Sequence, residues 1–303
     1  MGSCERASTG WTLGGGHVID LARPEVVGIL NLTPDSFSDG GSYASVGAAV
    51  AHAADMARLG AAMIDIGGES TRPGASRIEA AEQIARVVPV IRAIRGAAVT
   101  DSHGRPIPIS IDTTRAPVAL AAIEAGADAI NDVSAGEEDP VILALAAERG
   151  CGLVLMHRLA PPDQDSFSDR YERAPVYADV VKEVAGYLGT RAAAADRAGV
   201  RREAIVLDPG LGFGKTVEQN LELIRRSAEL ASLAGGYPIV SGLSRKSFVA
   251  RASGLGPDSR PSARLAGTIA LTLSHAQHGA RLMRVHDVGP IVEALRAWSR
   301  VTL

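Results

Sequence analysis

Short apolar segments of β-forming residues alternate with longer alanine-rich amphipathic segments along most of this chain, and that alternation constrains its fold more than any other feature. The expected strands span residues 26–31, 62–66, 107–112, 128–132, 152–156, 204–208, 238–242 and 281–285. The expected helices span residues 46–59, 78–95, 114–125, 139–149, 175–199, 218–232, 260–279 and 289–300. Alternating strands and helices predict a parallel sheet. Eight such units in one chain predict an α/β fold of the (β/α)8 TIM-barrel type, with a doubly wound open sheet as the alternative.

The remaining segments predict one domain with few additions. Residues 11–21, WTLGGGHVIDL, are typical of a β-hairpin with a glycine-rich turn, which is expected to plug the bottom of the barrel. Residues 1–10 are expected to be a disordered N-terminal tail, and 11–303 a single barrel domain without a linker. Residues 157–174 are expected to form a long surface loop, and residues 100–106 lengthen the link before the third strand. The sequence indicates no role for either segment.

Composition excludes several classes of function. Hydrophobic residues make up 46% of the chain and charged residues 21%, which is ordinary for a globular protein. The net charge of −3 provides no broad basic surface for nucleic acid or an anionic membrane. The two cysteines, Cys4 and Cys151, form neither a disulfide framework nor a metal-binding spacing. Because no signal peptide and no membrane-length apolar run is evident, a cytoplasmic location is expected.

Polar side chains follow the expected strands at their carboxyl ends. The residues at these ends are Asn31, Asp65, Asp112, Asn131, Asp132, His157, Asp208, Arg284, His286 and Asp287, with GLSRKS (242–247) after the seventh strand. One Asp at a strand end is often only a turn residue or a helix cap. In a barrel, however, all strands present their carboxyl ends at one face, where functional residues gather. The pattern therefore predicts one polar pocket at that face.

Three of these residues suit a flat ligand that carries several N–H donors. Asp112, Asn131 and Asp208 come from three different strands and are expected to point toward one axis. A buried carboxylate can accept two parallel hydrogen bonds from a guanidine-like edge, and such charge-assisted bonds are strong. A pterin ring offers this edge. Lys246, one of only three lysines in the chain, could hold the ring carbonyl.

A second set suits an anion. Arg284 and His286 alternate along the eighth strand, so both side chains are expected on the same side. Together with Asn31 from the neighbouring first strand they could grip a diphosphate. Asn31 also offers an oxygen to Mg²⁺, which binds phosphates through few protein ligands and many waters.

The segment PGLGFGKT, residues 209–216, resembles a phosphate-binding P-loop only in part. That motif needs glycine where this chain has Pro209, and Asp208 adds negative charge beside any phosphate. A nucleotide site of this type is therefore not expected.

Seven motifs in order resemble the dihydropteroate synthase family. They are GILNLTPDSFSDGG, IDIGGESTRPGA, ISIDTTRAPVA, INDVSAG, LDPGLGFGKT, GLSRKSF and RVHDV, and the resemblance runs from about residue 11 to 300. It implies a transferase of folate biosynthesis on a (β/α)8 barrel. The reaction implied joins 6-hydroxymethyl-7,8-dihydropterin diphosphate to 4-aminobenzoate, giving 7,8-dihydropteroate and diphosphate. It also implies Mg²⁺ as cofactor and sulfonamides as inhibitors.

The resemblance also implies roles for individual residues. Catalytic roles fall to Asp112, Lys246, Arg284, His286 and Asp35. Substrate-binding roles fall to Thr71, Arg72, Pro73, Asp112, Asn131, Met156, Asp208, Phe213, Gly242, Lys246, Ser247, Arg284, His286 and Phe37, and Asn31 is the metal ligand. Residues 33–41 and 71–73 belong to two mobile loops, and Ser247 is placed at the aminobenzoate carboxylate. A homodimer through residues 260–279 and 289–300 is expected.

Two other functions remain possible for such a barrel. A pterin-binding methyltransferase shares the acidic pterin set but has no need for the SRKS motif or a diphosphate grip. A non-catalytic pterin-binding paralogue would have lost loop or anion-binding residues, whereas this chain retains them. A diphosphate-release assay with and without 4-aminobenzoate distinguishes the three.

Overall fold

A closed barrel of parallel strands forms the centre of the protein. The computed structural model describes residues 10–32 and 42–302. The barrel strands are β3 (Glu25–Asn31), β4 (Met63–Gly67), β5 (Ile109–Asp112), β6 (Ala129–Asp132), β7 (Gly152–Met156), β8 (Ile205–Asp208), β9 (Ile239–Ser241) and β10 (Ala280–Val285). Each pairs with its neighbours in chain order, and β10 pairs with β3 to close the ring. The closure confirms the predicted barrel and excludes the open sheet.

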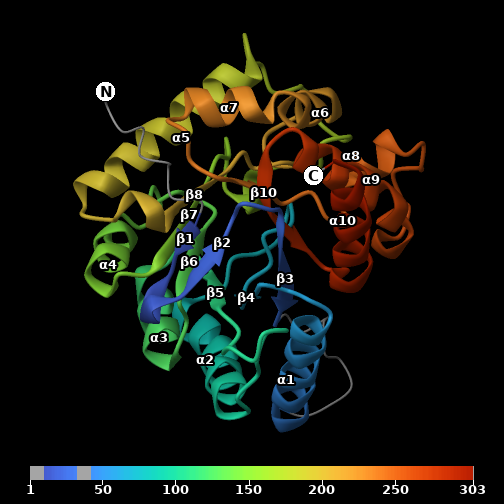
Figure 1. Cartoon of the computed structure of the whole chain (residues 1–303). Coiled ribbons are helices and arrows are strands. Elements are labelled where there is room, and N and C mark those ends of the chain that lie inside the picture. The colour runs from blue at the N-terminus through green and yellow to red at the C-terminus, as the bar shows by residue number, and fades with distance from the viewer. Residues whose placement is uncertain (1–9, 33–41, 303) are drawn as a thin grey trace, which may run out of the picture.

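Helices surround the barrel on its outside (Figure 1). They are α1 (Ser42–Arg58), α2 (Ala80–Gly96), α3 (Ala116–Ala125), α4 (Val141–Arg149), α5 (Val180–Arg197), α6 (Val217–Arg225), α7 (Ser227–Leu233), α8 (Ser247–Ala252), α9 (Leu265–Gln277) and α10 (Val288–Thr302). Short 3₁₀ turns lie at Gly14–Gly16, Pro162–Gln164, Arg202–Ala204 and Pro261–Arg264. No helix within the described ranges is both long and apolar enough to cross a bilayer.

Two helical predictions were wrong in detail. Residues 218–232 were expected to form one helix, but the helix is interrupted at Arg226, whose φ of −108° and ψ of 27° are not helical. Residues 247–252 form α8, which the sequence did not predict. A helix of six residues is too short to display a recognisable apolar period.

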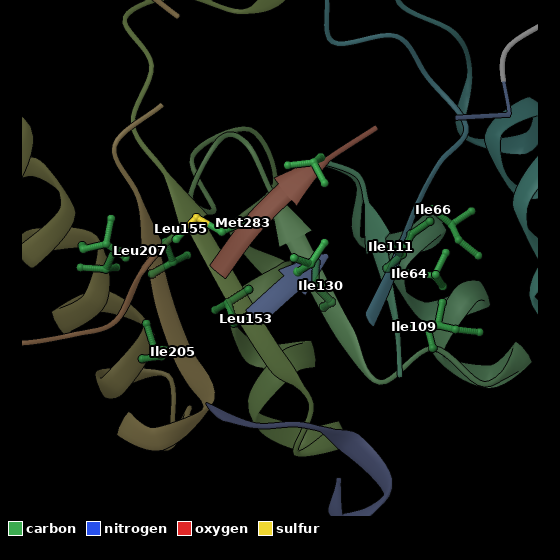
Figure 2. Packing of buried hydrophobic residues seen from close by; sticks show 14 of the residues in the cluster. Ile64, Ile66, Ile109, Ile111, Ile130, Leu153, Leu155, Ile205, Leu207 and Met283 are labelled. Atoms are coloured by element: carbon green, nitrogen blue, oxygen red, sulfur yellow. The ribbon is translucent and has the colours of Figure 1, made fainter. Parts of the chain in front are cut away.

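The strands bury both of their faces, as their sequences require. Ile64, Ile66, Ile109 and Ile111 point outward and pack against the helices, together with other residues of the cluster in Figure 2. Residues of the opposite parity point into the barrel, because side chains alternate along a strand. The outward layer is largely apolar, although it includes Ser241, whose hydroxyl lies 2.9 Å from His275 of α9, whereas the inward layer changes from apolar to polar along the strands.

A hairpin closes the amino end of the barrel. It consists of β1 (Gly10–Thr12) and β2 (Val18–Asp20), and its Trp11 packs against inward residues of the strands. The Trp11 Nε1 atom donates to the Ala204 carbonyl at 2.8 Å. A side chain at Gly152 would lie 2.6 Å from Leu13 Cδ2, so glycine leaves room for the hairpin. The predicted plug is thus confirmed, and a substrate pocket has to open at the carboxyl end.

The structure describes residues 100–106 in full, and only the last residue of the predicted N-terminal tail. Residues 1–9 of the expected tail lie outside the described residues, whereas Gly10 already belongs to β1. Residues 100–106 form a surface turn, in which Thr100 and Pro106 make an isolated β-bridge. Asp101 accepts hydrogen bonds from the backbone of His103 at 2.8 Å and of Arg105 at 2.9 Å. The segment therefore carries its own turn structure.

Candidate active site

The register of the barrel places the predicted polar residues at one level. Gly67 at the end of β4 pairs with Asn31 on one side and with Asp112 on the other, and Asp112 pairs with Asn131. Met156 pairs with Asp208 on the far side of the barrel. These carboxyl ends therefore form a continuous rim around the upper mouth.

Arg284 links two of the strand-end carboxylates. Its Nε atom donates to Asp65 Oδ2 at 2.6 Å, and its Nη2 atom donates to Asp112 Oδ2 at 2.7 Å. Although burial opposes charge, the two carboxylates raise the pKa of Arg284 above its usual value. Asp65 also accepts from Asn131 Nδ2 at 3.1 Å and from Ser110 Oγ at 2.6 Å. One buried carboxylate thus orients Arg284 and Asn131 together.

Asp112 keeps one oxygen free for a ligand. Its Oδ1 atom is buried and has no hydrogen-bond partner in the described part of the chain. Burial raises the pKa of Asp112 to about 7, with Arg284 opposing the shift and Asp65 adding to it. An unpartnered buried acceptor costs about 1–3 kcal/mol. A ligand that donates a hydrogen bond at this point would remove the cost.

Asp208 and Lys246 form the opposite side of the mouth. Asp208 Oδ1 accepts from the Gly210 backbone at 2.7 Å, and burial raises the pKa of Asp208 while Lys246 lowers it. Burial lowers the pKa of Lys246 to about 8. A side chain at Gly242 would lie 3.2 Å from Asp208 Oδ2 and 3.9 Å from Lys246 Nζ. Glycine therefore leaves both charged groups accessible.

An apolar wall adjoins these charges. Val133, Met156 and Phe213 form a small buried cluster of their own at the carboxyl end of the strands. The Lys246 Nζ atom lies 4.1 Å from the centroid of the Phe213 ring, in cation–π geometry, and donates to the Leu211 carbonyl. Charged groups beside apolar side chains suit a flat polar heterocycle.

Arg284 and His286 both lie at the β10 end of the site. His286 Nδ1 lies 3.1 Å from Ser244 Oγ, and the Ser244 hydroxyl also accepts from the His286 backbone at 3.2 Å. Burial, with the charges of Arg245 and Arg284, lowers the pKa of His286 to about 3. The imidazole is therefore neutral in the ligand-free protein, and its interaction with Ser244 fixes the orientation of the ring.

Asn31 fits a metal held mainly by a substrate. It is partly buried at the end of β3, and its amide has no hydrogen-bond partner among the described residues. Within residues 10–32 and 42–302 no cluster of His, Cys, Asp and Glu could coordinate a metal by itself. One neutral oxygen suits Mg²⁺, which takes most of its ligands from phosphate and water.

The loops over the mouth are described in part. Residues 33–41, and with them Asp35 and Phe37, lie outside the described residues. Thr71, Arg72 and Pro73 lie on the loop between β4 and α2, partly or fully exposed. The adjacent Gly74 backbone donates to the Pro162 carbonyl at 2.8 Å. Segment 157–174 thus contacts the second loop.

Ser247 lies beside the charged rim, at the start of α8 directly after Lys246, with 9% of its surface exposed.

Sequence reasoning placed Asp65 among the polar residues at the strand ends but assigned it no catalytic or binding role. It is 1% exposed and contacts Arg284, Asn131 and Ser110. The signal was present, because Asp65 interrupts the apolar strand MIDIG two residues before its end. A charge inside a buried strand needs a partner, and the partner here comes from β10.

Comparisons with known proteins agree with this geometry. The family model described as pterin binding enzyme matches residues 27–286. The dihydropteroate synthase of Escherichia coli K12 is 41% identical over 281 residues, covering 93% of each chain. That of Streptococcus pyogenes serotype M3 is 45% identical over 273 residues, covering 90% of this chain and 94% of the relative.

Solved structures are similar over nearly the whole chain. Dihydropteroate synthase of Xanthomonas albilineans with 4-aminobenzoic acid has a TM-score of 0.85 at 40% identity, covering 98% of this chain and 99% of that one. The same enzyme with 7,8-dihydropteroate has a TM-score of 0.79 at 39% identity, covering 95% and 97%. The Yersinia pestis enzyme in a sulfonamide complex has a TM-score of 0.82 at 36% identity, covering 95% and 98%.

Proposed function

The chain belongs to the dihydropteroate synthases of the pterin-binding enzyme family, and from this premise we propose how its own residues perform the reaction. The enzyme is a transferase of folate synthesis. It condenses 6-hydroxymethyl-7,8-dihydropterin diphosphate with 4-aminobenzoate, and 7,8-dihydropteroate and diphosphate are the products.

The observation that carries the assignment of the pterin site is the free, buried Oδ1 of Asp112 opposite Asp208 and Lys246. The two carboxylates and Asn131 accept and donate hydrogen bonds around the edge of the pterin ring. Lys246 holds the ring carbonyl, and Met156 and Phe213 contact the ring faces. Asp208 is 6% exposed, so its hydrogen bonds to the ring are shielded from water and strong.

Departure of diphosphate leaves a methylene cation conjugated with the pterin ring. Arg284 and His286 bind the departing group at the β10 end, and the negative charge of Asp112 stabilises the cation. Asn31 would hold Mg²⁺, which when bound neutralises charge on the diphosphate. The aniline nitrogen of 4-aminobenzoate then attacks the methylene carbon, and no strong general base is required.

The two loops would close over 4-aminobenzoate. Pro73 and Phe37 would line its site, and Asp35 would order the first loop. Ser247 would contact the carboxylate of 4-aminobenzoate. Sulfonamides would occupy the same place, and the Yersinia pestis relative is known in complex with a sulfonamide.

An assay of diphosphate release tests this assignment. We expect diphosphate to be released from the pterin substrate only when 4-aminobenzoate is present, and 7,8-dihydropteroate to be formed in equal amount. Release without dependence on 4-aminobenzoate, or pterin binding without any release, would contradict a synthase.

A homodimer through α9 and α10 is also part of the proposal. On α9 the buried face carries Thr268, Thr272 and His275, while Ile269 and Leu273 are only partly buried. Ile269 and Leu273 pack against the core and stay partly exposed, and exposed apolar surface of this kind is typical of an interface. Light scattering is expected to give a dimer, and Ala270→Arg on the exposed face is expected to give a monomer. Ala193→Arg on exposed α5 is the control.

We also place the enzyme in the cytoplasm. The buried thiol of Cys151 is free, as expected in a reducing compartment. Fractionation of the producing cell tests the location.

A further inference from the structure

Lys215 is a completely buried lysine outside the proposed pterin contacts. Its side chain is 0% exposed, and its Nζ atom lies 3.1 Å from the Gly210 carbonyl, 2.7 Å from the Phe213 carbonyl and 3.0 Å from His157 Nδ1. An ammonium group has three donors, and here all three have acceptors. Such burial is costly, so the three contacts call for an explanation.

The third acceptor, His157, is neutral. It lies directly after β7, and burial with the nearby charge of Lys215 lowers the pKa of His157 to about 2. Nδ1 of a neutral imidazole can accept from the ammonium when the ring hydrogen is on Nε2. The ring is packed edge-on against Tyr187, with centroids 4.9 Å apart. His157 is thus a fixed acceptor rather than a mobile one.

The loop around Lys215 turns unusually tightly. Gly210, Gly212 and Gly214 have positive φ values of 66°, 86° and 59°. A side chain at Gly210 would come within 1.8 Å of the His157 carbonyl, so no other residue fits there. This course turns the carbonyls of Gly210 and Phe213 toward one point, which the Lys215 amine occupies.

Other residues hold the same loop from outside. Asn220 Oδ1 accepts from the Gly212 backbone at 2.6 Å. Asp165, from segment 157–174, accepts from the Gly214 backbone at 3.0 Å and from the Tyr171 hydroxyl at 2.5 Å. Segment 157–174 therefore supports the loop that Lys215 holds from within.

The loop carries two groups that touch Lys246. The Phe213 ring lies 4.1 Å from Lys246 Nζ, and the Leu211 carbonyl accepts a hydrogen bond from the same atom. The Lys215 amine donates a hydrogen bond to the Phe213 carbonyl, so a substitution of Lys215 affects the backbone of the same residue that carries the ring. Lys215 itself is fully buried and does not reach the pocket.

We propose that Lys215 is a positioning residue, which fixes loop 209–214 so that Phe213 and Leu211 hold Lys246 in place for the pterin ring. The proposal rests on the proposed function, because it concerns the same pterin site. It also gives the GFGK segment a role other than phosphate binding.

A double-mutant cycle tests the proposal. The dissociation constant of 6-hydroxymethylpterin, which lacks diphosphate, is measured by calorimetry for Lys215→Met, Phe213→Ala and the double variant. Lys215→Met is expected to weaken binding about tenfold, the loss of one hydrogen bond to a charged group. In the Phe213→Ala background its further effect is expected to be smaller than in the wild-type background, because only the contact through Leu211 then remains.

The outcomes separate the possible roles. The proposal would be overturned if the effects of the two substitutions on the dissociation constant multiply in the double variant. It would also be overturned if Lys215→Met binds the pterin as tightly as the wild type does. Lys182→Met, at a lysine whose side chain is 66% exposed, is the matched control and is expected to bind like the wild type. Failure of the wild type to bind the pterin would contradict the proposed function instead.

A second variant covers failure to fold. His157→Phe removes one of the three acceptors of Lys215 and preserves the ring. It is expected to weaken pterin binding less than Lys215→Met does, with a smaller loss in the Phe213→Ala background than in the wild-type background. Wild-type pterin affinity in His157→Phe, or effects that multiply with Phe213→Ala, would contradict the role of the cluster.

Discussion

Arg284 donates to Asp112 through only one carboxylate oxygen, Oδ2, at 2.7 Å, and leaves Oδ1 of the same residue buried and free. The ion pair therefore orients the carboxylate and leaves its second oxygen available to a ligand. The guanidinium is itself fixed by Asp65 at 2.6 Å. An acid held in place with an unused acceptor is suited to a ligand with an N–H donor, since ligand binding then pairs an atom that otherwise stays unsatisfied.

Asp112 and Lys246 face each other across the mouth of the barrel, and their pKa values predict a pH optimum for pterin binding. Burial raises the pKa of Asp112 to about 7 and lowers that of Lys246 to about 8. Below about pH 7 Asp112 is protonated and loses acceptor strength, and above about pH 8 Lys246 loses its charge. Calorimetric titration with 6-hydroxymethylpterin is expected to give the highest affinity between these values.

Variants separate the two limbs of that profile. Asp112→Asn is expected to remove the fall in affinity just below pH 7 while keeping the alkaline fall. Because burial also raises the pKa of Asp208, an acid limb from that group should remain. A profile unchanged by Asp112→Asn would show that another group controls it.

Asp65→Asn is expected to reduce kcat/KM by about 10- to 100-fold and to lower the melting temperature, because Arg284 loses one of its two buried carboxylate partners. Asn keeps the shape of Asp but weakens the hydrogen bonds to Arg284 and Asn131, and hydrogen bonds to charged groups contribute about 1.5–3 kcal/mol. Steady-state kinetics and thermal melting measure the two effects. Asp55→Asn, at an exposed carboxylate paired with Arg58, is the control. Equal activity of both variants would make Asp65 dispensable.

His286→Ala is expected to slow turnover by about tenfold or more while changing the affinity for 6-hydroxymethylpterin by less than about twofold. The neutral imidazole, oriented by Ser244, would donate to the diphosphate, which this pterin lacks. Single-turnover kinetics and calorimetry give the two values, and exposed His52→Ala is the control. Proportional losses in both would indicate a structural histidine.

The order of the strands and the polar residues inside the barrel at its carboxyl end were predictable, because both follow from local sequence patterns. Each βα unit needs only its own apolar run and amphipathic helix, and the barrel then brings Asp112, Asn131 and Asp208 to one end. The eight predicted strands all exist, and their ends shift by at most two residues. The hairpin plug was also predictable, because GGG between two short β-runs indicates a turn.

Features that depend on contacts between distant segments were not predictable. The partner of Asp65 is Arg284, 219 positions away, and no local pattern links them. Arg226, at which the predicted helix breaks, donates to Asp179 at 3.1 Å, and Asp179 lies 47 positions away in the sequence. Lys215 looked like part of a failed phosphate motif, and only burial among two carbonyls and His157 gives it a role.

Asp208→Asn is expected to weaken pterin binding by about 1.5 kcal/mol or more, the low end for a hydrogen bond to a charged group. Asp208 lies opposite Asp112 at the end of β8, and its Oδ2 remains open beside Gly242. An Asn amide at this position would turn one acceptor into a donor facing the N–H groups of the ring. Calorimetry with 6-hydroxymethylpterin measures the loss, and Asp258→Asn, whose carboxylate is 90% exposed, is the matched control. If Asp208→Asn binds this pterin as tightly as the control does, the ring edge does not lie at Asp208, and the orientation proposed for the pterin is wrong.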